Sequence, residues 1–142
     1  MRHTGRAGLE LIKHFEGLRL EAYLCPAGVW TIGYGSTRGV IESMTITETE
    51  AEAMLRRDLL TAERSVLRLV NVPLTHNQFD ALVSFTFNLG GGALQRSTLR
   101  RKVNREDHED VPAELLKWNR AGGKISRGLI RRRQAEAELY TA

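Results

Sequence analysis

This sequence lacks several features that would indicate a particular class of protein. It contains one cysteine, Cys25, so no internal disulfide can form. Its histidines, acidic residues and cysteine show no cluster with metal-ligand spacing, so no metal site is expected. No run of about 18 apolar residues occurs, and residues 1–8 lack the apolar core of a secretory signal. The sequence also has no internal repeat and no low-complexity segment.

The composition that is present is typical of a soluble globular domain. Hydrophobic residues make up 42% and charged residues 27% of the 142 residues, enough to bury a core within one domain. Lysine and arginine number 21 against 17 acidic residues, a net charge of +4. This modest excess suits an anionic polymer or surface as a partner but does not choose one.

The most informative stretch runs from Phe15 to Thr37 and carries a glutamate at a predicted helix end. Apolar residues at three- and four-residue spacing precede Glu16, and Gly17 is a natural helix stop. The negative end of the helix dipole and apolar neighbours both disfavour an ionised carboxylate at this position. A carboxyl group kept neutral near pH 7 is what a general acid needs. The alternative is an ordinary exposed glutamate at a helix end.

A β-hairpin is predicted next, around the loop Pro26-Ala27-Gly28. With three loop residues, Cys25 faces Val29 and Tyr23 faces Thr31. Cys25 and Thr31 then project from the same side of the hairpin, whereas a two-residue loop would separate them. We therefore predict the three-residue loop and expect the small sheet to continue through residues 33–45.

The rest of the chain is predicted to be helical. Two capping boxes, at Thr47 and Thr75, predict helices over residues 47–70 and 76–88. Further helices are expected over residues 97–104, from an N-cap at Asp110 to about residue 119, and over residues 127–140.

Three segments carry a resemblance to a known family. The run EGLRLEAYLCPAGVWTIGYGST, the run QFDALVSFTFNLG and the pattern WN…GLIRRRQAE together resemble the phage-type lysozymes, the endolysins of glycoside hydrolase family 24. The resemblance implies an α+β, lysozyme-like fold with a small antiparallel β-hairpin lobe and a larger helical lobe around a substrate cleft. It places the β lobe at about residues 18–46, the connecting helix at 47–70 and the helical lobe at 1–17 and 71–142, within one domain.

The resemblance also assigns catalytic roles. Glu16 matches the acid that protonates the glycosidic oxygen, and Thr31 matches the threonine that helps to hold the attacking water. The third position, normally aspartate, is occupied by Cys25. A thiolate can act as nucleophile or base, but a neutral thiol does poorly at either task. Three interpretations of Cys25 follow. It replaces the aspartate functionally, with a lowered thiol pKa; it is an inactivating or engineered substitution; or it is a small residue without a chemical role in a degenerate lysozyme.

Further residues are expected near the substrate. Asn88 matches a polar residue that faces the cleft, and Tyr34 and Ser36 are predicted substrate contacts, although many members carry histidine at the Ser36 position. In relatives, a basic residue before the last helix pairs with the catalytic glutamate. Lys124 and Arg127 are both candidates for that role.

The implied function is hydrolysis of the β-1,4 bond between N-acetylmuramic acid and N-acetylglucosamine in peptidoglycan, without a cofactor. The protein would be a monomer that stays in the host cytoplasm until a separate membrane pore releases it to the wall. Its positive charge would help to hold it on anionic wall or outer-membrane polymers. Three alternatives compete with this reading: an inactive wall-binding lysozyme, a cysteine hydrolase pairing Cys25 with a histidine, and a nucleic-acid-binding module. The last would use the four arginines of the C-terminal helix: Arg127, Arg131, Arg132 and Arg133.

Overall fold

The computed structural model describes residues 1–142, and its first elements are a helix and a hairpin. Helix α1 (Arg6–Glu16) ends at Gly17, as predicted, so Glu16 is its last residue. Strands β1 (Arg19–Leu24) and β2 (Trp30–Gly33) then pair antiparallel. The remaining helices are α2 (Glu48–Leu69), α3 (His76–Leu89), α4 (Gly91–Arg96), α5 (Thr98–Asn104), the 3-10 helix η1 (His108–Asp110), α6 (Val111–Leu116) and α7 (Arg127–Thr141), with strands β3 (Arg120–Ala121) and β4 (Lys124–Ile125) before α7.

The hairpin has the predicted three-residue loop. Tyr23 pairs with Thr31, and the Cys25 amide donates to the Val29 carbonyl at 3.0 Å. Gly28 has φ +77°, the left-handed conformation that the loop requires. Cys25 and Thr31 therefore share one side of the ribbon, as the sequence pattern predicts.

The prediction that the sheet continues as strands through residues 33–45 is wrong. Only isolated bridges form, between Ile32 and Ser36 and between Glu21 and Thr45. The chain turns back at once after β2, and most of the polar segment that follows is irregular. A tight turn and turn residues override the weak apolar pattern of residues 40–42.

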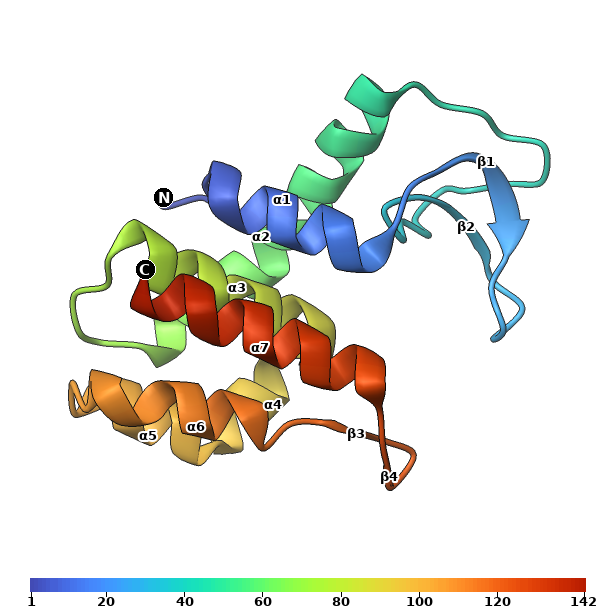
Figure 1. Ribbon diagram of the computed structural model, residues 1–142. Coiled ribbons are helices and arrows are strands. Elements are labelled where there is room, and N and C mark those ends of the chain that lie inside the picture. Colours follow the sequence, from blue (N-terminus) through green and yellow to red (C-terminus); the bar gives the residue numbers. More distant parts are fainter.

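The two long predicted helices are confirmed, each with its capping box. Thr47 with Glu50 and Thr75 with Gln78 make both reciprocal bonds. Helix α2 runs from the side of the molecule that carries the β1–β2 hairpin, here called the β lobe, to the side where α1, α3 and α7 pack together, here called the helical lobe (Figure 1). A cluster of 23 buried hydrophobic residues forms the core, and five of them lie on α3: Phe79, Ala81, Leu82, Val83 and Phe85. No helix combines the length and the apolarity needed to cross a membrane.

The C-terminal third departs from the prediction in small elements. Helix α4 begins within the glycine run, where the sequence predicts no helix, and the loop at residues 122–123 closes a short β3–β4 hairpin. Helix α6 ends at Leu116 rather than near residue 119. Asp110 occupies the N-cap position and Pro112 lies in the first turn, as predicted, but the Asp110 carboxylate makes no capping hydrogen bond and instead forms an ion pair with Lys102 at 3.0 Å. The last helix is confirmed over nearly its predicted range.

Candidate active site

Glu16 lies where the helical lobe meets the β lobe, and its partner is a buried arginine. Glu16 Oε2 accepts a hydrogen bond from Arg132 Nη1 at 2.8 Å. The Arg132 side chain is 5% exposed and that of Glu16 is 24% exposed. Neither Lys124 nor Arg127 makes this contact, so the expected partner is wrong. Both are exposed, whereas the face of α7 that packs against α1 and α3 carries Arg132.

The other candidate catalytic groups lie on the hairpin. The Cys25 side chain is a free, partly exposed thiol at the end of β1. Hydrogen bonding to the backbone of Val29 lowers the pKa of the Cys25 thiol most, with smaller contributions from Ala27 and the Thr31 hydroxyl, although burial acts in the opposite direction. Thr31 is 4% exposed, and its hydroxyl donates to the Val29 carbonyl at 2.9 Å. The hairpin thus shifts the pKa of the Cys25 thiol in the direction that favours a thiolate, at a position where the sequence offers no flanking cation.

The turn after β2 packs against the glutamate. A Cβ built on Gly35 would lie 3.4 Å from Glu16 Oε1, and Gly35 has φ +88°. The positive φ favours glycine at this position, because the backbone of any other residue would be strained, and the short distance shows that the turn lies against the carboxylate. Glu16 Oε1 makes no hydrogen bond to the protein, so the oxygen not held by Arg132 is the one that lies near this turn.

The structure does not support substrate contacts for two residues of this turn. Ser36 is 1% exposed, and its hydroxyl donates to Asp58 on α2 at 2.5 Å, so it ties the turn to the connecting helix. Tyr34 is 8% exposed, and its ring belongs to the core, with the Lys13 ammonium 5.5 Å from the ring centroid. Both predictions of direct binding are therefore wrong, because packing against α2 turns these side chains inward.

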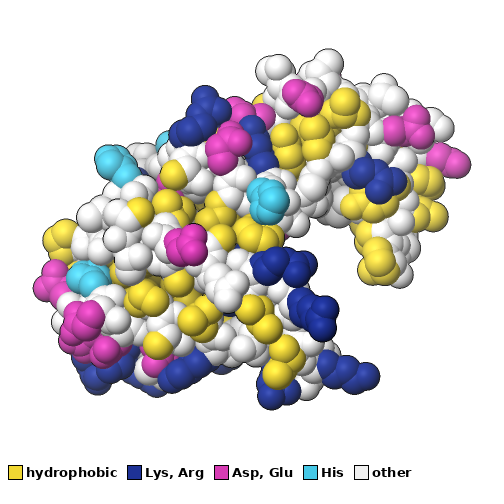
Figure 2. All heavy atoms as spheres, viewed as in Figure 1, with side chains coloured by type: hydrophobic (Ala, Val, Ile, Leu, Met, Phe, Trp, Pro, Cys, Tyr) yellow, Lys and Arg dark blue, Asp and Glu magenta, His cyan; other side chains and the backbone are white.

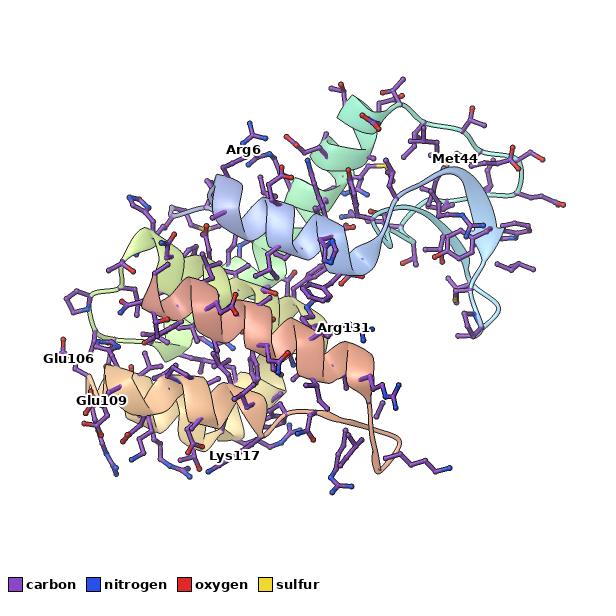
Figure 3. All side chains as sticks on the ribbon, in the orientation of Figure 1. Arg6, Met44, Glu106, Glu109, Lys117 and Arg131 are labelled. Carbon is purple, nitrogen blue, oxygen red and sulfur yellow. The ribbon has the colours of Figure 1, made fainter.

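Asn88 does line a pocket beside the glutamate. An open pocket of about 410 Å³ lies between the end of α1 and the start of α7 and is lined by His14, Phe15, Asn88, Ser126, Gly128, Leu129, Arg131 and Arg132. Figure 2 shows the surface hollowed between the two lobes, with Lys and Arg side chains along the edge of the helical lobe that faces the β lobe. Arg131, labelled in Figure 3, lies at this edge.

Sequence reasoning missed the buried charges behind this pocket. Arg133 and Glu136 are both fully buried, and Arg133 Nε lies 2.7 Å from Glu136 Oε1. Burial removes Arg132 and Arg133 from the basic surface that the nucleic-acid alternative requires. The available signal was Glu136, which follows Arg132 and Arg133 at i+4 and i+3, the spacings at which helical side chains meet.

Comparisons with known proteins agree with this arrangement. The phage lysozyme family model matches residues 13–136. The endolysin of Acyrthosiphon pisum secondary endosymbiont phage 1 is 46% identical over 142 residues, covering 97% of each chain. The muramidase domain of SpmX from Asticaccaulis excentricus is 44% identical with a TM-score of 0.91, covering 99% of each chain.

A third relative has been solved in two forms. The active form of the P1 phage endolysin Lyz is 32% identical, with a TM-score of 0.87 over 96% of this chain and 83% of that one. The secreted inactive form is 31% identical and reaches a TM-score of only 0.65, over 96% and 94% of the two chains. From the matched family model and these relatives, the chain belongs to the phage lysozyme family and is a glycoside hydrolase of the muramidase type.

Proposed function

We propose that the protein is an endolysin that cuts the β-1,4 bond between N-acetylmuramic acid and N-acetylglucosamine during host lysis. The observation that carries this proposal is the pairing of Glu16 with buried Arg132 beside an open pocket. This contact holds one carboxylate oxygen and leaves Oε1 without a protein partner, so that Oε1 is the oxygen that delivers a proton to the glycosidic oxygen.

Cys25 supplies the second group of the reaction. Its lowered pKa supports a thiolate, which can attack the anomeric carbon or take a proton from water. Thr31, on the same side of the hairpin, would hold that water. Attack by sulfur forms a covalent intermediate and retains the anomeric configuration, whereas base catalysis inverts it. NMR of the first-formed sugar product distinguishes the two routes.

The similarity to one form of a relative supports an active enzyme. The TM-score of 0.87 with the active form of Lyz exceeds the 0.65 with its secreted inactive form, although the sequence identities are nearly equal. The arrangement of this chain is therefore closer to that of a competent endolysin than to that of an inactive one.

A turbidity assay on permeabilised bacteria tests the proposal. Wild-type protein should lyse the cells, and Glu16→Gln should abolish lysis because an amide cannot donate the required proton. Glu10→Gln is the matched control, since Glu10 lies on the same helix with a side chain 59% exposed. Full lysis by Glu16→Gln would refute the assigned acid.

Variants of the thiol test the second group. Cys25→Asp should keep much of the activity because a carboxylate can perform either role, whereas Cys25→Ser should lose most of it. Equal activity of the serine variant and the wild type would show that the sulfur has no chemical role.

The alternative function is that of an inactive protein that binds peptidoglycan. It predicts sedimentation with purified wall but no release of reducing sugars. For the active enzyme, we propose that the protein is a monomer, accumulates in the host cytoplasm and acts from the periplasm after release. The net charge of +4 would strengthen adsorption to anionic wall or outer-membrane polymers, so added salt should weaken adsorption.

A further inference from the structure

Glu136 is a buried carboxylate that lies between two arginines. Its side chain is fully buried in the middle of α7. Glu136 Oε2 accepts from Ser84 Oγ of α3 at 2.6 Å and from Arg133 Nη2 at 3.0 Å, and lies 3.5 Å from Arg132 Nε. A buried carboxylate must be paired to remain charged, and here the two guanidinium groups and the hydroxyl pair with it.

The first arginine connects Glu136 to the candidate acid. Arg132 reaches Glu16 through Nη1 at 2.8 Å, while its Nε and Nη2 lie 3.4 Å from the hydroxyl and the carbonyl oxygen of Ser84. The guanidinium is planar and rigid, so contacts on its inner edge fix the direction in which its outer nitrogen points. Glu136 and Ser84 therefore set the position of the nitrogen that holds Glu16.

The second arginine connects Glu136 to the pocket residue Asn88. Arg133 Nη2 donates to Asn88 Oδ1 at 2.8 Å, and Arg133 is fully buried. Arginine has donors but no acceptor, so the Asn88 oxygen, and not its nitrogen, must face Arg133. The NH₂ group of Asn88 makes no hydrogen bond to the protein, so it is free to donate to an oxygen of a sugar bound in the pocket that Asn88 lines.

We propose that Glu136 is a positioning residue for the active site, holding Arg132 against Glu16 and Arg133 against Asn88. This inference rests on the proposed function, because it takes Glu16 as the acid and Asn88 as a substrate contact. Buried residues of the helical lobe would thus orient both Glu16 and Asn88.

The first test compares two glutamates of α7. Glu136→Gln and the control Glu138→Gln, an exposed position two residues on, are assayed on soluble glycan fragments of peptidoglycan. For Glu136→Gln we expect kcat to fall about tenfold or more, because small displacements of a reacting group are costly, and KM to rise as Asn88 loosens. Glu138→Gln should leave both unchanged. Circular dichroism gives the folded fraction, so that rates are expressed per folded molecule.

A second pair of variants, which perturbs the interior less, tests the inference if Glu136→Gln does not fold. Ser84→Ala removes one hydrogen bond to Glu136, whereas Thr86→Val alters a buried hydroxyl of the same helix that has no hydrogen-bond partner. We expect Ser84→Ala to lower kcat and to shift the side-chain amide NMR signals of Asn88. Thr86→Val should do neither.

These outcomes separate the inference from the proposed function. If kcat, KM and the Asn88 amide signals of folded Glu136→Gln or Ser84→Ala match the wild type, the positioning role is refuted. If Glu16→Gln itself stays active, the proposed function fails instead. A loss of stability with unchanged kinetics per folded molecule would make Glu136 a merely structural residue and would likewise overturn the inference.

Discussion

Replacement of Gly8 by alanine should destabilise the protein through the start of α1. This helix has no side-chain cap at Gly5. The buried carboxylate of Asp80, on α3, takes the place of an N-cap side chain. It accepts hydrogen bonds from the Gly5 and Gly8 amides, each at 3.0 Å. A methyl group on Gly8 would lie 2.7 Å from both Asp80 Cβ and Thr4 Cγ2, so α1 and α3 would have to separate.

The magnitude follows from the bonds that such a shift would break. Hydrogen bonds to a charged group contribute about 1.5–3 kcal/mol each, so losing both would cost about 3–6 kcal/mol. Alanine gains about 1 kcal/mol over glycine inside a helix. The net expectation for Gly8→Ala is a loss of about 2–5 kcal/mol in the free energy of unfolding.

Equilibrium unfolding in urea measures this change, with Gly92→Ala as the matched control. Gly92 is an exposed helical glycine, and the nearest atom to an added Cβ is the flexible end of Arg96 at 3.6 Å. The control should be neutral or stabilised by up to about 1 kcal/mol. Equal stability of the Gly8→Ala variant and the wild type would refute the close-approach argument.

Three other variants test separate parts of the molecule. The pH midpoint of the alkylation rate of Cys25 should lie below that of the cysteine thiol in an unstructured peptide, and Thr31→Val should move the midpoint upward; an unchanged midpoint would contradict the hydroxyl's contribution. Burial raises the pKa of Tyr140, so above about pH 10 the unfolded chain releases a proton that the folded chain keeps, and stability falls; Tyr140→Phe should flatten that slope in urea titrations. Ser36→Ala should cost about 1.5–3 kcal/mol by thermal unfolding, since it leaves the Asp58 carboxylate without its donor; a change below about 0.5 kcal/mol would show that water replaces the hydroxyl.

Local signals explain what the sequence could predict. The capping boxes at Thr47 and Thr75 and the loop Pro26-Ala27-Gly28 each act within a few residues, and all three appear in the structure as predicted. The common side of Cys25 and Thr31 follows from the loop length alone. The relative placement of Cys25 and Thr31 on the hairpin can therefore be predicted from the sequence without knowledge of the fold.

The helical side of the site depends on contacts that local patterns do not encode. Choosing among Lys124, Arg127 and Arg132 as the partner of Glu16 requires knowing which face of α7 packs against α1. The inward direction of Tyr34 and Ser36 likewise depends on the position of α2. Helix α4 escaped prediction because its opening glycines resemble a loop, and tertiary packing rather than propensity forms it.

The ion pair between Glu16 and Arg132 joins residues 116 positions apart in the chain. A ribosome therefore makes Glu16 long before its counter-ion, Arg132. Until the last helix has emerged and docked, a nascent chain holds its glutamate without the arginine that orients it. If Glu16 is the acid, as proposed, the chain becomes able to cleave glycan strands only after α7 has docked, and nonsense mutations that remove α7 should leave an inactive fragment.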